Sequence, residues 1–165
     1  MKKKSNVILI FLIALLPLKA FAESWTANEV LSATLVLEAG NQGREAMHGV
    51  MNVIENRGCL RPDDYLGVVL RRRQFTVWNG VNDQRQRIDD IILRLRRSEK
   101  PQWDIAEELV CLSLLEERLF DITNRSTHFY SGKKEPWWAK AMMKTIKIGT
   151  LQFLRAKIKG EQTYE

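Results

Sequence analysis

Residues 30–39 read VLSATLVLEA and predict a buried helix that carries a carboxylate near its end. Leu31, Leu35 and Glu38 recur at helical spacing, so all three lie on one apolar face. Gly40 and Asn41 come next, and either residue readily takes the left-handed conformation that ends many helices. An apolar face seldom includes a Glu for structural reasons alone, so this stretch points to both the fold and the candidate site.

Two effects oppose the ionisation of Glu38 at this place. The side chain lies in the last turn of the predicted helix, at the negative end of the helix dipole, and its neighbours are apolar. Both effects raise the pKa of a carboxyl group, which suits a general acid at neutral pH. Two structural alternatives stay open: the side chain turns into solvent, or it pairs with Arg44.

The N-terminal residues have the three parts of an export signal. Lysines occupy positions 2–4, residues 7–18 are almost continuously apolar, and Ala-Phe-Ala at 20–22 matches the small-x-small cleavage pattern. We therefore expect cleavage after Ala22. The apolar run is short for a membrane span, although an uncleaved anchor remains an alternative.

The expected mature protein is one domain of moderate size. Removing residues 1–22 from the 165-residue chain leaves 143 residues, with a catalytic domain at 23–160 and a polar tail at 161–165. The net charge falls from +6 to +2, because the removed segment holds four lysines and no acidic residue. This balance argues against a nucleic-acid-binding protein and suits an envelope polymer as partner. We expect an exported monomer of the periplasm or cell wall, without stable membrane association.

The two cysteines, Cys59 and Cys111, favour a disulfide, since an even number in an oxidising compartment usually pairs. The alternative is two buried thiols, because Cys111 lies in an apolar run. The only histidines are His48 and His128, and no Cys-x-x-Cys or His-x-x-x-His pair occurs. The sequence therefore predicts no zinc site and no cofactor.

Hydrophobic periodicity predicts a mainly α domain, of the α+β type, with a small late β-sheet or hairpin. Thr26 and Glu29 form a capping box before the first helix. Further helices are expected at about 44–56, 65–70, 84–97 and 105–119, with a short one at 136–143. Strand-like runs occupy 127–130, 145–148 and 151–154, and Gly149-Thr150 is a hairpin signal between the last two.

Several separated segments carry recognisable motifs. They are EAGNQG at 38–43, VMNVIENR at 50–57, QFT at 74–76, DIT at 121–123 with STHFY at 126–130, and WAK at 138–140 with Ile148-Gly149 and Phe153. In this order they resemble the cell wall hydrolases that include the spore-cortex-lytic enzymes. Residues 79–104 are largely unmatched. Arg125, Thr76, Leu151 and Leu154 depart from the residues usual in that family, which bears on substrate preference or activity level.

The resemblance implies a lysozyme-like fold that cuts the bond between N-acetylmuramic acid and N-acetylglucosamine in peptidoglycan. Many such enzymes are lytic transglycosylases, in which one carboxyl, here Glu38, acts first as acid and then as base. The product then carries a 1,6-anhydro sugar. Hydrolytic glycosidases instead usually need two carboxylates at a defined separation.

The same segments supply candidate substrate-binding residues. Gln74 and Thr76 could bind the N-acetyl or hydroxyl groups of the sugar, although a simple turn would also explain them. His128 and Tyr130 alternate with Phe129 along a strand, so two of the three could face the cleft. His128 could equally be structural. Trp78, in a loop, is the preferred sugar-stacking residue, with burial in the core as the alternative.

Other functions remain open on the sequence alone. A hydrolytic muramidase would need a second carboxylate from the set Glu45, Glu55, Asp63, Asp64 and Asp83. For Glu55 we expect a surface pairing with an arginine instead. The residues that depart from the family motifs would fit a non-catalytic protein that binds peptidoglycan. An amidase is disfavoured, because such enzymes commonly use zinc or a Cys-His pair.

Overall fold

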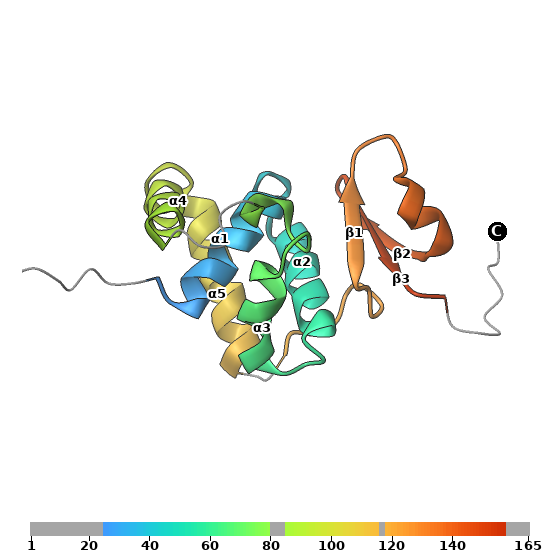
Figure 1. The fold of residues 1–165 in the computed structure, drawn as a ribbon, viewed down its shortest axis with the longest axis horizontal. Helices are drawn as coiled ribbons and strands as arrows, with labels where there is room; N and C mark the ends of the chain where they lie inside the picture. Colours follow the sequence, from blue (N-terminus) through green and yellow to red (C-terminus); the bar gives the residue numbers. More distant parts are fainter. Residues whose placement is uncertain (1–24, 80–84, 116–117, 158–165) are drawn as a thin grey trace, which may run out of the picture.

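The computed structural model describes residues 25–79, 85–115 and 118–157. The predicted signal peptide, residues 1–22, and the tail, 161–165, lie outside these ranges. The elements are α1 (Ala27–Ala39), η1 (Gly40–Gln42), α2 (Arg44–Arg57), α3 (Pro62–Leu70), η2 (Thr76–Trp78), α4 (Arg85–Ser98), α5 (Lys100–Leu115), β1 (His128–Ser131), η3 (Trp137–Ala141), β2 (Met143–Ile148) and β3 (Leu151–Arg155). A helical body precedes a small sheet (Figure 1). The expected mainly α architecture with a late sheet is confirmed.

Helix α1 forms the centre of the helical body. The predicted capping box is present: the Thr26 hydroxyl accepts from the backbone of Glu29, whose carboxylate accepts from the Thr26 backbone at 2.6 Å. Leu31 and Leu35 are buried, and α1 contacts α2, α3, α4 and α5. A helix surrounded in this way is apolar around most of its circumference, as the sequence of residues 30–39 indicates.

The junction between α1 and α2 differs from the expectation. Gly40 keeps a right-handed conformation (φ −58°) and begins the short helix η1, whereas Gly43 takes the positive φ of 88° before α2 starts. The expected left-handed stop at Gly40-Asn41 is therefore wrong, and the direction of the chain changes at Gly43, where glycine adopts this φ without a steric penalty.

Several helices begin or end at residues other than those that the hydrophobic periodicity predicts. Helix α3 begins at Pro62, since proline at the first helical position has no hydrogen bond to lose. Helix α5 spans Lys100–Leu115 rather than 105–119, and η3 ends at Ala141, before β2. The expected helix at 84–97 is confirmed as α4, within one residue at each end.

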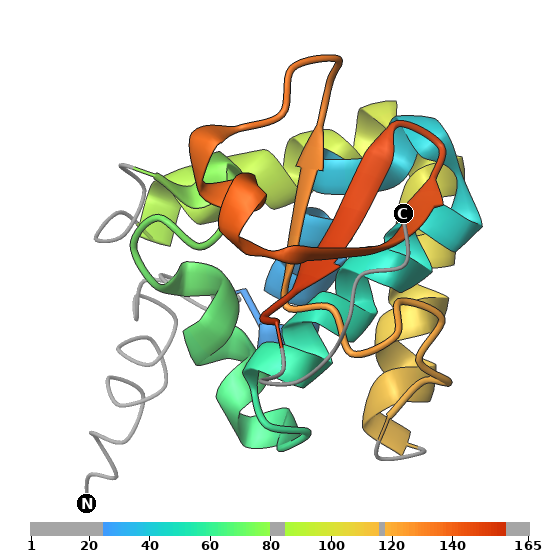
Figure 2. The same ribbon diagram turned by 90° about the vertical axis from the view of Figure 1, so that its right-hand side faces the viewer.

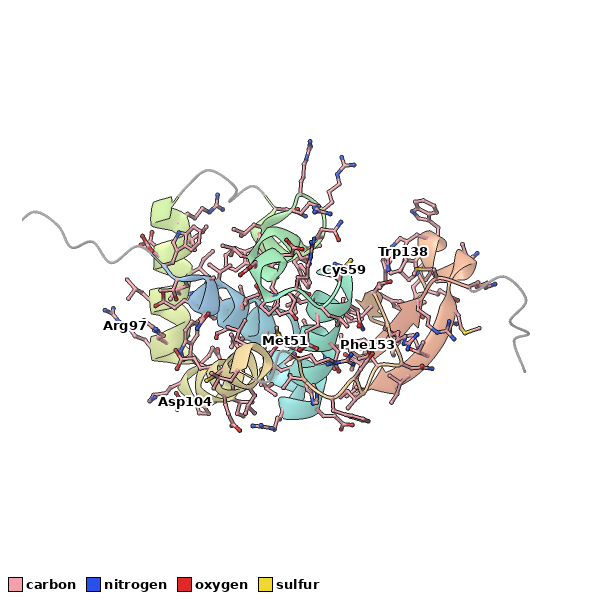
Figure 3. All side chains as sticks on the ribbon, turned by 90° about the horizontal axis from the view of Figure 1, so that it is seen from below. Met51, Cys59, Arg97, Asp104, Trp138 and Phe153 are labelled. Carbon is pink, nitrogen blue, oxygen red and sulfur yellow. The ribbon has the colours of Figure 1, made fainter. Side chains whose placement is uncertain are left out.

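The sheet is antiparallel in the order β1-β3-β2. Gly149 (φ 57°) and Thr150 join β2 to β3, so the predicted hairpin is confirmed. Figure 2, seen from the sheet side, shows the strands in front of α2. Phe153 of β3 lies between sheet and helices (Figure 3), and a Cβ on Gly49 of α2 would come within 2.6 Å of its ring. The missing side chain at Gly49 therefore lets the sheet pack closely on α2.

Candidate active site

Glu38 lies in the last turn of α1, where the helical body meets the sheet. Its side chain is half-buried, and its Oε1 atom is buried without a hydrogen-bond partner in the structure. The backbone N–H of Val77 favours the charged form of this carboxyl group. The suggested pairing with Arg44 is wrong, because Arg44 binds Glu108 through two hydrogen bonds of 2.7 and 2.8 Å. Among the described residues, none of the ion pairs involves Glu38.

The pKa of Glu38 is raised above that of an ordinary glutamate. Burial is the main cause, because it disfavours the charged form. The hydrogen bond from Val77 and the positive charge of Arg57 act in the opposite direction and lower the pKa without cancelling the effect of burial. Glu38 therefore stays protonated to a higher pH in this site than it would in water.

A cavity of about 240 Å³ opens beside this carboxyl group. It is lined by Glu38, Arg57, Gln74, Thr76, Phe129, Tyr130 and Ser131. These residues come from α1, the end of α2, the segment before and within η2, and β1. Three of the residues singled out in the sequence, Gln74, Thr76 and Tyr130, thus line one cavity with Glu38.

Arg57 joins the separate walls of this cavity. Its Nε donates to the Thr127 carbonyl at 2.5 Å and its guanidinium donates to the Gln74 carbonyl at 3.4 Å. The guanidinium also lies over the Phe75 ring, 5.2 Å from its centroid. Burial lowers the pKa of Arg57 to about 10, while the negative charge of Glu38 raises it. The sequence marked Arg57 only as the end of a motif, and its role depends on contacts between distant segments.

Strand β1 presents different residues on its two faces. Phe129 packs toward the core, with ring centroids 6.3 Å from Phe75 and 5.8 Å from Phe153. The rings of His128 and Tyr130 instead contact the ring of Trp138, with centroid-to-centroid distances of 5.8 and 6.2 Å. Tyr130 also borders the cavity of Glu38, whereas His128 does not. The ring of His128 is hydrogen-bonded to Thr127, and burial lowers its pKa.

Trp78 does not lie in the cavity, so the expectation that it stacks on a sugar is corrected. Its side chain is 1% exposed, and its indole N–H donates to the Thr34 hydroxyl of α1 at 2.9 Å. The short helix η2 turns the ring inward, where burial of its large apolar surface stabilises the fold. Its position in a loop-like segment was a misleading signal of exposure.

The other carboxylates named from the sequence that the structure describes do not line the small cavity. Glu55 is 1% exposed and accepts hydrogen bonds from Asn52 (2.9 Å), Ser113 (2.6 Å) and the Leu119 backbone (2.7 Å). The expected surface pairing of Glu55 with an arginine is therefore wrong. Of the remaining four, Glu45 and Asp63 are exposed, Asp64 pairs with Arg61, and Asp83 lies outside the described residues.

Glu38 also lines a second cavity, of about 580 Å³. Glu38 and Ser131 line both cavities, so the two cavities adjoin at these residues. The wall on the sheet side includes Gln42 and Thr150, and the Gln42 side-chain oxygen accepts from the Thr150 backbone at 2.6 Å and from its hydroxyl at 2.8 Å. These bonds fix η1 to the β2–β3 turn. Two adjoining cavities that share Glu38 offer space for neighbouring units of an extended polymer.

The cysteines do not form the disulfide expected from the sequence. Cys59 and Cys111 are both free and both exposed, so the alternative of two buried thiols is also wrong. Cys111 lies on the outer side of α5 although its neighbours in sequence are apolar. In the described part of the chain, His, Cys, Asp and Glu side chains do not gather in threes that could hold a metal ion.

The sequence pattern of the Cell Wall Hydrolase family matches residues 41–154. The match covers more than half of the chain, which therefore belongs to this family, as the motifs indicated. Family membership makes it a protein that acts on peptidoglycan. The matched region contains Arg57, Gln74, Thr76 and Tyr130 but begins three residues after Glu38. No curated protein and no solved structure is significantly similar to the chain.

Proposed function

We propose that this protein is an exported lytic transglycosylase that cuts peptidoglycan between N-acetylmuramic acid and N-acetylglucosamine, with Glu38 as acid and base. One observation carries the proposal: Glu38 is half-buried, lines two cavities and has a raised pKa. Among the described residues, no other carboxylate lines the smaller cavity. A single sheltered carboxyl suits a reaction in which the same group first gives and then takes a proton.

The proposed reaction balances around this one proton. Protonated Glu38 gives its proton to the glycosidic oxygen as the bond from the muramic acid C1 to that oxygen breaks. The resulting carboxylate stabilises the positive charge that develops on the sugar ring. It then takes the proton of the 6-hydroxyl of the same sugar while the C1–O6 bond forms. Glu38 is protonated again, and one product ends in a 1,6-anhydro ring.

The other cavity residues would bind and position the sugar. Gln74 and Thr76 offer an amide and a hydroxyl to the N-acetyl or hydroxyl groups, and Tyr130 borders the same space. Arg57 acts as a positioning residue, because it ties the Gln74 and Thr127 backbones together beside Glu38. Such preorganised contacts reduce the entropic cost of aligning the sugar with the acid.

Export is part of the proposal and rests on residues 1–22 of the sequence. Within the described ranges, none of the helices has the length and apolar character that a membrane crossing requires. We place the enzyme in the periplasm or cell wall as a monomer, with glycan strands as its partner.

A hydrolytic muramidase is the second candidate, because Glu99 lines the larger cavity together with Glu38. Glu99 is exposed and could activate water if the two carboxylates stood at the separation that hydrolysis needs. The non-catalytic alternative rests on residues that depart from the family motifs. It has less support, because two of them, Leu151 and Leu154, are buried in the sheet. Arg125 does not border either cavity of Glu38.

Digestion of purified sacculi, with mass spectrometry of the released sugar ends, tests the proposal. We expect 1,6-anhydro-muramic acid ends that appear in step with the loss of sacculus turbidity. Reducing muramic acid ends without the anhydro sugar would replace the transglycosylase by the hydrolase. Binding without any release of sugar would support the non-catalytic alternative.

A further inference from the structure

The larger cavity has a wall that the cleavage reaction does not use. Arg94 and Ser98 from the end of α4, Glu99 from the link to α5, and Gln102 from the first turn of α5 line it. These residues lie in the part of the sequence without recognisable motifs. The wall faces the same space as Glu38 and is mostly polar.

Arg94 and Glu99 give this wall one positive and one negative charge. Both side chains are exposed. Within the described ranges neither takes part in an ion pair, whereas their neighbours do: Arg96 binds Glu29 at 2.9 Å and Lys100 binds Asp104 at 2.9 Å. Two opposite charges left free on a cavity wall suit a ligand that carries both an anionic and a cationic group.

The wall is held in place by the packing of α4. Leu95 is buried, and Arg96 lies over the Trp103 ring, 5.0 Å from its centroid, while it binds Glu29 of α1. Gln102 lies close to η1, 3.6 Å from where a Cβ of Gly40 would stand. Arg94 and Glu99 therefore project from a well-packed part of the structure beside the larger cavity.

We propose that this wall binds the stem peptide of peptidoglycan, with Arg94 facing peptide carboxylates and Glu99 facing a free peptide amino group. The inference rests on the proposed function and adds a substrate requirement to it. The peptide is attached to the lactyl group of muramic acid, the sugar next to the bond that is cut. A wall that shares a cavity with Glu38 lies within reach of a peptide attached there. Stem peptides carry several carboxylates and, when not cross-linked through it, the side-chain amine of a diamino acid.

Matched substrates with and without peptides test this inference. The first readout is the ratio of initial cleavage rates on peptide-bearing glycan strands and on strands stripped of peptides by an amidase. Arg94→Gln should lower this ratio about fivefold, the effect of one solvent-accessible charge pair. Arg97→Gln is the control: Arg97 is exposed on the outer side of α4 (Figure 3), does not line the cavity, and should leave the ratio unchanged.

Glu99→Gln separates the peptide-binding role from a catalytic one. We expect it to lower the preference for strands with free peptide amines and to have no such effect after those amines are acetylated. Equal loss of cleavage on all substrates, stripped strands included, would instead assign Glu99 to hydrolysis and overturn its role here.

A binding measurement keeps this inference separable from the proposed function. In a Glu38→Gln background, the dissociation constants for soluble tetrasaccharides with and without stem peptides should differ. Arg94→Gln should reduce the ratio of the two dissociation constants about fivefold. Equal affinities that Arg94→Gln does not change would overturn the inference alone. Peptide-dependent binding in a wild-type protein that cuts no substrate would overturn the proposed function and leave the inference standing.

Discussion

Arg57 and Glu38 line one cavity, and each stabilises the charged form of the other. Burial raises the pKa of Glu38 and lowers that of Arg57 to about 10, while their mutual attraction acts against both shifts. Arg57 also holds the Gln74 and Thr127 backbones. The charge and the contacts of Arg57 can be separated by mutation.

Arg57→Met should move the pH dependence of cleavage to higher pH. Glu38 acts as an acid only when protonated, so kcat/KM falls as pH rises through its pKa. The positive charge of Arg57 lowers that pKa, and its removal therefore raises the pKa further. Arg57→Lys keeps a positive charge, so kcat/KM should still fall near the wild-type pH. Its kcat should drop, because the contacts with the Gln74 and Thr127 carbonyls weaken. A purely structural role for Arg57 would lower the rate without moving the profile.

Glu38→Gln should change the pH dependence of stability even without substrate. The pKa of Glu38 is higher in the folded than in the unfolded chain, so its stabilising contribution is present below the unfolded pKa of about 4.5 and is lost as pH rises through the folded value. The Tm of the variant should therefore rise relative to that of the wild type as pH increases from 4.5 through the folded pKa of Glu38. Glu45→Gln, at an exposed position, should show no such gain. A constant Tm difference across this range would mean that the pKa of Glu38 is unchanged by folding.

Gly49→Ala should destabilise the protein by about 1–3 kcal/mol, because the new methyl group would overpack against the Phe153 ring at 2.6 Å. Gly67→Ala is the matched control, since no atom lies within 4 Å of its added Cβ on the exposed side of α3. The control should stabilise by about 0.5–1 kcal/mol, as expected for alanine in a helix. Urea unfolding of the three proteins measures both effects, and equal changes for both variants would contradict close packing of the sheet on α2.

Glu55→Ala should cost about 3 kcal/mol or more, since the Asn52, Ser113 and Leu119 donors lose one buried acceptor. The milder Glu55→Gln keeps an acceptor oxygen and should cost less. Where Glu55→Gln remains folded, its products should be those of the wild type, because Glu55 is remote from both cavities of Glu38. Loss of cleavage in a folded Glu55→Gln protein would make Glu55 a catalytic candidate again.

Local signals in the sequence predicted the elements that depend on local physics. The Thr26 capping box, the apolar helix that carries Glu38 and the hairpin at Gly149-Thr150 are all present. Each depends on hydrogen bonds or periodicity within a few residues of chain. The order of the motifs likewise predicted the family, which the match over residues 41–154 confirms.

The features that the sequence did not predict depend on tertiary contacts. Trp78 is buried because its indole reaches Thr34, which is 44 residues earlier in the chain. Glu55 is buried because donors 58 and 64 residues away surround it. Arg57 binds a carbonyl 70 residues further along. Hydrophobic periodicity carries no information about such partners, so loop-like Trp78 and charged Glu55 both looked exposed.

The most direct test of the central claim is the rate of sacculus cleavage by Glu38→Gln relative to Glu45→Gln. The amide is nearly isosteric with the carboxyl but cannot supply the proton, so we predict a loss of about a thousandfold or more. Glu45→Gln, with its side chain in solvent, should keep the wild-type rate. Both proteins must give the circular dichroism of the folded wild type. Cleavage by folded Glu38→Gln at the rate of Glu45→Gln would contradict the assignment of Glu38 as the catalytic acid.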